Sequence, residues 1–340
     1  MKVLWIALIL VALLVAYIAA VWIVSLSDSK VRADVVEVPA TGAASEETLT
    51  LMIWNIGYAG LGAESDFQAD GGEMLQPPSK AVVEKNLAGI QRVLGEEDAD
   101  VYLFQEMARG GFLNRGVDVV EGVRAALPDH SSQFTPDVRT RLLPGDMALK
   151  HGLGVFWRVE ADAPAIVRLP DEPGTIMGFI KRRYHMQVLD FEHAGQAWSV
   201  IDVHLSAFDE GANTRMQQLE QVIALAEEKY AAGRAVAIGG DWNMRLAPTD
   251  FASTSDESAL FWIHDFPQEK LPEGWQMAVD PGVPTVRTNE RPYKRGENYR
   301  TIIDGLLVSP NVEVVSADGL DLDFQITDHQ PVRYVLKARP

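Results

Sequence analysis

The hydrophobic positions of this chain form one long run near the N-terminus and then a series of short runs that end in polar side chains. The long run, Val3–Val24, is apolar and carries no charge. From about Thr48 onward the apolar runs are short and end at glycine or polar residues, as buried β-strands do. This pattern predicts an N-terminal apolar helix followed by a globular domain.

The N-terminal run is long enough as a helix to cross a hydrocarbon core of roughly 30 Å. Its last residues, Ile23 to Leu26, offer no small-residue cleavage site, which favours a membrane anchor over a cleaved signal peptide. We expect a transmembrane anchor at 1–27, a flexible, small and acidic linker at 28–47, and one folded domain at 48–340. The flanking charges give no decisive orientation. A single span with so short an N-terminal flank favours an extracytoplasmic domain, with a secreted form as the alternative.

Two segments show apolar residues at helical spacing. The first is Lys80–Leu94, with Ser79 as its N-cap, and the second is Asn213–Lys229. Each leads into a short apolar run, which is interpreted as a strand. The predicted strands are Leu49–Trp54, Val101–Phe104, Gly152–Phe156, Trp198–Val203, Ala235–Ile238, Thr301–Val308 and Val332–Leu336.

The most informative of these strands is Ala235–Ile238, because it stops at two glycines and is followed by Asp241 and Asn243. The glycines allow another group to approach the backbone closely. Asp can accept a hydrogen bond or bind a hard cation, and Asn can donate to a phosphate oxygen. Taken alone, the same residues also fit a tight turn.

Polar side chains recur at other strand ends. Asp304 falls inside the predicted strand Thr301–Val308, where a carboxylate is costly unless it is paired or bound to a cation. Each position has an ordinary explanation, such as a turn, a salt bridge at the rim of a sheet, or a structural histidine. Their number favours one shared site. The positions are Asn55, Glu106, His204, Asp241, Asn243, Asp304, Asp328 and His329.

These residue types suit metal-assisted attack of water on a phosphoester. Glu106, helped by Asn55, can hold Mg²⁺, which takes few carboxylates and keeps water or substrate oxygens. Asp304 can accept a hydrogen bond from His329 and hold it in the tautomer that deprotonates water. His204 and Asn243 can contact phosphate oxygens while the metal offsets charge in the transition state. No G-x-S-x-G, P-loop or H-E-x-x-H motif competes with this interpretation.

Six motifs in this order resemble those of the endonuclease/exonuclease/phosphatase superfamily. They are WNIG, LFQEM, DVHLS, GGDWNM, IIDGLLVS and TDHQPV. The superfamily contains metal-dependent phosphoesterases similar to pancreatic-type deoxyribonuclease, apurinic endonucleases, sphingomyelinases and inositol-polyphosphate phosphatases. The resemblance covers residues from about Thr48 to the C-terminus. It implies an α/β fold, a four-layer αββα sandwich of two mixed sheets with the active site at one rim.

The resemblance also implies roles for the matching residues and Mg²⁺ as cofactor, with Mn²⁺ as an alternative. The histidine of the last motif acts in the family as general base or as a contact to the phosphoryl group, and this role is shared with the aspartate of GGDWNM. Trp242 stands where the family often has Phe. The implied metal ligands are Glu106, Asn55 and Asp328. The implied catalytic residues are His329, Asp304, Asp241, Asn243 and His204.

More narrowly, the chain looks like a bacterial subgroup that joins an N-terminal hydrophobic segment to this domain. The stretches NIGYAG, DFQADGG and NYRTIIDGLLVSPNV carry that resemblance. The first hypothesis is therefore a membrane-tethered, Mg²⁺-dependent phosphoesterase acting on a small or lipid-linked substrate. The alternatives are an exported metal-dependent nuclease and a non-catalytic binding protein on the same fold.

Charge and composition restrict the partners. The net charge of −18 disfavours long duplex DNA, which is bound mainly through Lys and Arg. The absence of cysteine excludes disulfides and thiolate metal sites. We expect a monomeric domain. Local basic clusters occur despite the acidic whole, at Arg139 with Arg141, at Lys181–Arg183 and at Arg291–Arg300. Their alternative interpretation is solvated loop charge or structural ion pairs. The candidate substrate-binding residues are Arg215, Arg295 and Arg300.

Overall fold

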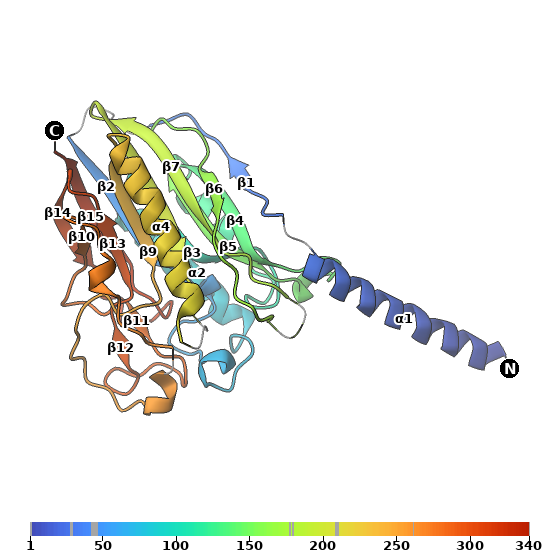
Figure 1. Cartoon of the computed structure of the whole chain (residues 1–340). Helices are drawn as coiled ribbons and strands as arrows, with labels where there is room; N and C mark the ends of the chain where they lie inside the picture. Colours follow the sequence, from blue (N-terminus) through green and yellow to red (C-terminus); the bar gives the residue numbers. More distant parts are fainter. Residues whose placement is uncertain are drawn as a thin grey trace.

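The structure is a computed structural model that describes residues 2–27, 30–41, 47–176, 178, 180–207, 211–260 and 262–339. A long helix, α1 (Lys2–Ser27), projects from one end of a layered α/β domain (Figure 1). The helix has 26 residues, and its length and composition are sufficient to cross a membrane. Anchor and signal sequence both satisfy that criterion, so the division of the chain at 27 and 47 stays a prediction.

Two mixed β-sheets pack face to face in the domain. The first sheet has the strand order β1-β4-β5-β3-β2-β15-β14, and the second has the order β10-β13-β9-β8-β7-β6. The first sheet comprises β1 (Asp34–Val36), β4 (Ser131–Arg139), β5 (Lys150–Trp157), β3 (Val101–Ala108), β2 (Thr48–Asn55), β15 (Val332–Ala338) and β14 (Val312–Gly319). The second comprises β10 (Gln276–Ala278), β13 (Asp304–Val308), β9 (Ala235–Asp241), β8 (Gln196–His204), β7 (His185–His193) and β6 (Ala165–Arg168).

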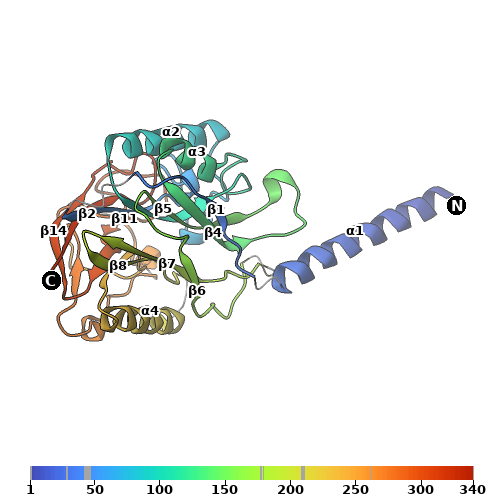
Figure 2. The same ribbon diagram turned by 90° about the horizontal axis from the view of Figure 1, so that it is seen from above.

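Helices cover the outer faces of both sheets (Figure 2). Helices α2 (Lys80–Glu96) and α3 (Val119–Ala126) pack on the first sheet, and α4 (Asn213–Ala231) packs on the second. One apolar core fills the space between the sheets, and two further cores lie under the helices. This is the four-layer sandwich that the resemblance implied, so the predicted fold class is confirmed.

The sequence explains both predicted helices. The hydroxyl of Ser79 caps α2 by accepting a hydrogen bond from the amide of Val82 (3.2 Å), as predicted. Val83, Ile90 and Val93 of α2 are buried against the first sheet. Sequence patterning missed α3, which is a helix of eight residues and too short to show a clear helical period.

The predicted strand Thr301–Val308 is wrong in one respect. The structure divides it into β12 (Arg300–Thr301), which pairs with β11 (Val286–Arg287), and β13. The break occurs because the Thr285 hydroxyl accepts hydrogen bonds from the amides of Ile303 and Asp304. Asp304 therefore begins a strand at the rim of the sheet and does not interrupt one.

Part of the expected linker belongs to the first sheet. Residues Asp34–Val36 form the edge strand β1, antiparallel to β4. Asp34 also forms ion pairs with Arg109 and Arg124. Residues 28–29 and 42–46 of the expected linker lie outside the described residues.

The topology gathers strand ends at one rim. Strands β8 and β9 are parallel, and their last residues, His204 and Asp241, are paired in register. The antiparallel strand β13 begins beside the same position, with Asp304 opposite Asp241. In the facing sheet, the parallel strands β2 and β3 pair Asn55 with Gln105. The strand ends that carry polar side chains therefore meet from both sheets.

Candidate functional site

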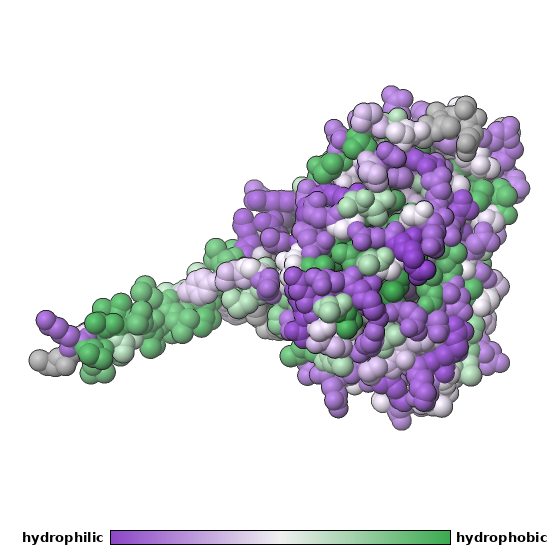
Figure 3. Space-filling view, turned by 180° about the vertical axis from the view of Figure 1, so that it is seen from behind, coloured by the Kyte–Doolittle hydropathy of each residue, from purple (hydrophilic) through white to green (hydrophobic). Residues whose placement is uncertain are grey.

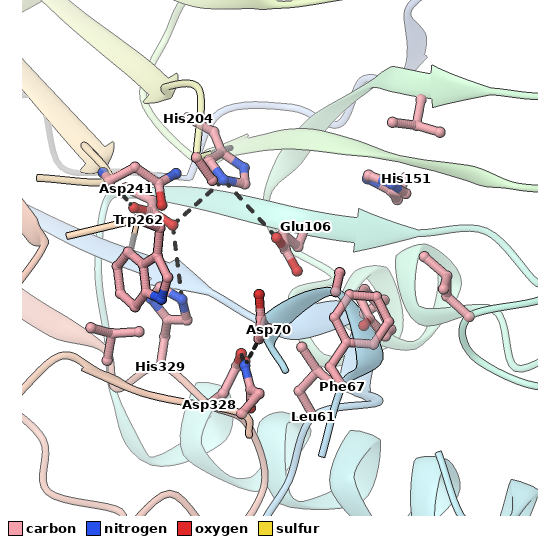
Figure 4. Close-up of a pocket in the computed structure, with 18 of the residues that line it drawn as sticks. Leu61, Phe67, Asp70, Glu106, His151, His204, Asp241, Trp262, Asp328 and His329 are labelled. Carbon is pink, nitrogen blue, oxygen red and sulfur yellow. Dashed lines mark hydrogen bonds and ion pairs between the residues drawn. The ribbon is translucent and has the colours of Figure 1, made fainter. Parts of the chain in front are cut away.

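The rim encloses a cavity of about 460 Å³. Glu106, His204, Asp241, Asp328 and His329 all line it and point toward the same hollow (Figure 4). The structure thus brings together the predicted residues of both sheets. Asn55 and Asp304 contact these side chains from behind the cavity wall.

Gly240 allows the strand end that carries Asp241 to form. Its φ is +142°, and a Cβ at this position would lie 2.0 Å from the carbonyl oxygen of Val203 on the neighbouring strand. A side chain would therefore separate β8 from β9. The glycine at this strand end is required by close packing of the two strands, and Asn243 follows in the left-handed region at φ 51°.

Asp241 is buried at the centre of the site. Its carboxylate accepts hydrogen bonds from the amide group of Asn55 (3.0 Å) and from the backbone amide of Asn243 (2.9 Å). Its Oδ2 lies 3.5 Å from Nε2 of His204 and 3.8 Å from Nε2 of His329. Burial, followed by the charge of Asp304, raises the pKa of Asp241 to about 6.

His329 and Asp304 form a buried pair. Nδ1 of His329 lies 2.9 Å from Oδ2 of Asp304, which matches the predicted orientation. Burial lowers the pKa of His329, but the charge and hydrogen bond of Asp304 and the charge of Asp241 outweigh it and raise the pKa to about 10. The other oxygen of Asp304 is buried and has no hydrogen-bond partner among the described residues.

A β-bulge directs Glu106 into the cavity. The register between β3 and β5 shifts between Phe104 and Met107, and Glu106 has a left-handed φ of 54°. Its Oε1 lies 4.0 Å from Nε2 of His204. Burial and the charge of Asp328 raise the pKa of Glu106 to about 8. Such strain at a non-glycine residue is typical of functional sites.

A series of charged side chains behind His204 was not predicted as part of the site. Arg182 donates to Nδ1 of His204 (2.9 Å) and, through Nε, to Asp137 (2.6 Å). Nδ1 of His151 lies 3.3 Å from the same carboxylate. Despite its burial, Asp137 has a lowered pKa because of the charge of Arg182. Arg182 lies in one of the basic clusters and His151 precedes a predicted strand, so both had a weak signal, whereas Asp137 had none.

Two further cavity residues were missed. The side-chain amide of Asn289 donates to Asp328 (2.7 Å) and to Asp70 (3.1 Å) and so holds two carboxylates near one another. Burial raises the pKa of Asp70 to about 6. Asp70 lies within the DFQADGG stretch of the subgroup resemblance. Asn289 had no signal, because it lies just after β11 in a loop without periodicity.

The three candidate substrate-binding arginines do not line the cavity. Arg215 is fully buried, and its guanidinium donates to the backbone carbonyl groups of Ser206, Ala207 and Asn243, among others. Arg295 forms ion pairs with Asp321 and Asp323 on the surface. Arg300 donates to the carbonyl of Ala252 and stacks on Phe251. Asn243 lines the cavity, but its side-chain amide donates to the carbonyl of Leu205 (2.8 Å).

The donor set fits a hard divalent cation. The raised pKa values of Glu106 and Asp241 arise in part from neighbouring carboxylates, and a bound cation would relieve that repulsion. Asp241, Asp304 and His329 each place one potential ligand atom within 4.8 Å of the others. The hydrogen bond between His329 and Asp304 already uses two of those groups, so Glu106 and Asp328, which face the cavity, are the better candidates.

Apolar side chains line much of the rest of the cavity. Leu61, Phe67 and Trp262 lie around the polar centre (Figure 4). Further lining residues are Leu75, Phe112, Leu113, Val138, Leu149, Ile176, Val286 and Ile303. The cavity thus combines a compact charged centre with an extended apolar lining, as small-molecule sites commonly do.

Comparisons with solved structures agree on the fold. An endonuclease/exonuclease/phosphatase from Beutenbergia cavernae DSM 12333 is 19% identical, with a TM-score of 0.56 over 86% of this chain and 72% of that chain. D. rerio TDP2 complexed with single strand DNA product is 14% identical, with a TM-score of 0.54 over 86% of this chain and 100% of that chain. The endonuclease/exonuclease/phosphatase from Bacteroides vulgatus is 16% identical, with a TM-score of 0.52 over 86% of this chain and 100% of that chain. At these identities the similarity shows the fold alone.

Among the curated proteins compared, none matches this sequence. The sequence model of the Endonuclease/Exonuclease/phosphatase family matches residues 52–329, which span the domain from β2 to His329. Together with the two-sheet architecture and the converging strand ends, this match identifies the chain as a member of the endonuclease/exonuclease/phosphatase family.

Proposed function

We propose that this protein is a membrane-anchored, Mg²⁺-dependent phosphoesterase that hydrolyses a small or lipid-linked phosphomono- or phosphodiester. The family consists generally of phosphoester hydrolases. The observation that carries the proposal is the convergence of Glu106, His204, Asp241 and the His329–Asp304 pair on one cavity. The anchoring part rests on the apolar helix α1.

The proposed cation-binding group comprises Glu106 and Asp328, which line the cavity, and Asn55, whose side-chain amide is held against Asp241. When bound, a divalent cation supplies positive charge for the developing phosphoryl charge and offsets the carboxylates that keep the pKa of His329 high. The oxygen of Asn55 also accepts a hydrogen bond from the backbone amide of Gly57 (3.0 Å), which holds it in place. Manganese is the expected substitute for magnesium.

His329 is the proposed general base. Its Nδ1–H donates to Asp304, which leaves Nε2 directed toward Asp241 and the cavity. Nε2 would accept the proton of the attacking water, and Asp304 would stabilise the imidazolium that results. Asp241 lies between the two histidines and orients the water, while the Nε2–H of His204 donates to a phosphoryl oxygen.

The apolar wall favours a substrate with an apolar portion over a polynucleotide. Base stacking on aromatic residues and a basic groove for the phosphates are the usual devices for nucleic acid, and the net charge of −18 opposes the second. An assay of the purified full chain in detergent micelles with Mg²⁺ tests the proposal on phospholipids, inositol phosphates, bis-p-nitrophenyl phosphate and DNA. Preferential turnover of DNA would favour the nuclease alternative, and no turnover would favour a binding protein.

A further inference from the structure

Helix α1 contacts two loops of the domain. The hydroxyl of Tyr17 donates to the carbonyl of Leu142, and the indole of Trp22 donates to the carbonyl of Gly178 (3.3 Å). Arg183 donates to the carbonyl of Leu26 near the end of the helix (2.9 Å). The last three turns of α1 therefore lie against the segments that carry residues 142 and 178.

The same two segments border the cavity. Val138 and Leu149 flank the loop between β4 and β5, and both line the cavity. Ile176 lines it as well and pairs with Ile180 across the bend that contacts Trp22. The apolar wall of the cavity thus adjoins the helix.

Large apolar side chains are exposed on the face of the domain that lies beside α1 and the cavity, and they are rare elsewhere among the described residues of the domain. Outside α1 and β1, the described residues include five exposed large hydrophobic side chains. Four lie at the cavity or on the loop that contacts α1: Leu75 (48% exposed) and Ile176 (39%) line the cavity, and Leu142 (53%) and Met147 (55%) belong to the loop between β4 and β5. The fifth is Val315 on β14, at the opposite edge of the first sheet. The green surface of α1 stands out from the largely polar domain in Figure 3.

Cationic side chains gather where α1 ends. Lys30, Arg139, Lys181 and Arg183 border a small recess together with Ser25 of the helix. One acid, Asp137, also borders it and pairs with Arg182, while Arg183 pairs with Asp171. Such a cluster in a chain of net charge −18 is complementary to anionic lipid head groups.

The position of Tyr17 along α1 determines how deep the loop that carries Leu142 lies in the membrane. Tyr17 precedes Ser27 by ten residues, so the contact with Leu142 lies about 15 Å along the helix from its end. A span of about 20 residues is needed to cross the hydrocarbon core. A membrane-crossing α1 therefore places Trp22 near the interface, where such residues are enriched, and Tyr17 about 7.5 Å deeper in the bilayer. The loop that carries Leu142 reaches the same level.

We propose that this face, defined by Leu75, Leu142, Met147 and Ile176, rests on the bilayer and inserts Leu142 and Met147 into the boundary between head groups and acyl chains. This inference rests on the proposed anchoring of α1. It places the mouth of the cavity at the lipid surface. A phospholipid could then present its head-group phosphate to His204 and His329 while its apolar part stays against the wall formed by Val138, Leu149 and Ile176.

The absence of cysteine in the chain allows a direct depth measurement. Leu142→Cys and Met147→Cys, each in the full chain, are labelled with an environment-sensitive fluorophore and reconstituted into phosphatidylcholine–phosphatidylglycerol vesicles. Val315→Cys is the matched control, because Val315 is similarly exposed and distant from the proposed face. Nitroxide groups on the acyl chains should quench the probes at 142 and 147 at least about threefold more than the probe at 315.

Equal quenching at all three positions, with α1 retained in the vesicles after alkaline carbonate extraction, would overturn the inference. Loss of the protein on extraction would instead refute the anchoring on which it rests. Lys181→Glu should reduce quenching at position 142 in anionic vesicles and leave it unchanged in pure phosphatidylcholine. Because the readout is depth and not turnover, it is independent of whether the phosphoesterase proposal holds. A probe at 142 that is shielded equally in detergent without lipid would indicate a protein contact and contradict the lipid assignment.

Discussion

Arg182 donates a hydrogen bond to Nδ1 of His204 across 2.9 Å, and this contact decides which nitrogen of His204 carries the proton. A guanidinium has donors and no acceptor, so Nδ1 accepts and the neutral ring carries its hydrogen on Nε2. Burial, and then the charge of Arg182, holds the pKa of His204 well below its usual range. His204 therefore offers the cavity a neutral N–H donor near Asp241 and Glu106.

Replacing Arg182 should impair catalysis through His204. In Arg182→Lys the side chain keeps its charge but cannot bridge His204 and Asp137, so we expect kcat to fall about 10- to 100-fold. Nitrogen NMR of the histidines should show a mixture of tautomers for His204. The matched control is Arg183→Lys, whose contacts lie with Asp171 and Leu26. Wild-type kcat and an unchanged tautomer in the Arg182 variant would refute the role.

Asp304→Asn should preserve the shape of the site and remove the charge that orients and stabilises His329. By analogy with other carboxylate–histidine pairs, kcat should fall about 10²- to 10⁴-fold with the fold intact. Thermal unfolding and steady-state kinetics on bis-p-nitrophenyl phosphate measure the two effects separately. A variant that retains more than about half of the activity would show that His329 does not depend on this pair.

Glu106→Gln should separate metal binding from stability. Because the pKa of Glu106 is raised to about 8, the folded metal-free protein retains a proton that the unfolded chain releases above about pH 4.5, so stability falls as the pH rises from about 4.5 to 8. Without metal at pH 8, the Gln variant should therefore melt at a higher temperature than the wild type. Added Mg²⁺ should stabilise the wild type and not the variant. Equal Mg²⁺-induced shifts in both proteins, measured by calorimetry, would exclude Glu106 as a ligand.

Asp202 gives the fold its own pH dependence. It is buried between the sheets and accepts a hydrogen bond from Gln105 (2.6 Å), and burial raises its pKa well above the ordinary value. A raised carboxyl pKa means that the folded state binds an extra proton, so its contribution is most favourable below about pH 4 and is lost as the pH rises. Asp202→Asn should therefore increase the melting temperature at pH 7 more than at pH 4. The opposite order would show that Asp202 is ionised in the fold.

The buried and surface arginines should behave differently. Arg215→Ala should destabilise the protein by about 3 kcal/mol or more, because several buried carbonyl groups lose their donor. Arg295→Ala removes only surface ion pairs and should leave both stability and kcat/KM nearly unchanged. Chemical denaturation and steady-state kinetics check the two outcomes. A large rise in KM for the Arg295 variant would restore its predicted role in substrate binding.

Much of the site was predictable because strand ends are marked in the sequence. The buried run that stops at Gly239-Gly240 places Asp241 at the end of a strand, and therefore at the rim of a sheet. His204 ends its own strand in the same way. Parallel pairing of β8 and β9 then brings the two residues into register. The order of the motifs also implied the correct four-layer fold.

Other features depend on tertiary contacts that leave no local pattern. Asp70 and Asn289 belong to loops more than 200 residues apart that meet only in the folded domain. Asp137 lies on β4, where nothing distinguishes it from a solvent-facing strand residue until Arg182 is placed beside it. The sequence predicts Arg215 as an anion contact because burial of an arginine among carbonyl groups cannot be inferred from its neighbours in sequence.

The central claim is that His329 acts as a base in a metal-dependent hydrolysis. The most direct measurement compares p-nitrophenol release from bis-p-nitrophenyl phosphate by the wild-type full chain and by His329→Gln, each with saturating Mg²⁺ and with EDTA. We predict turnover that requires the metal and falls at least about 100-fold in the variant. Turnover that persists in EDTA, or that is equal in the two proteins, would contradict the account.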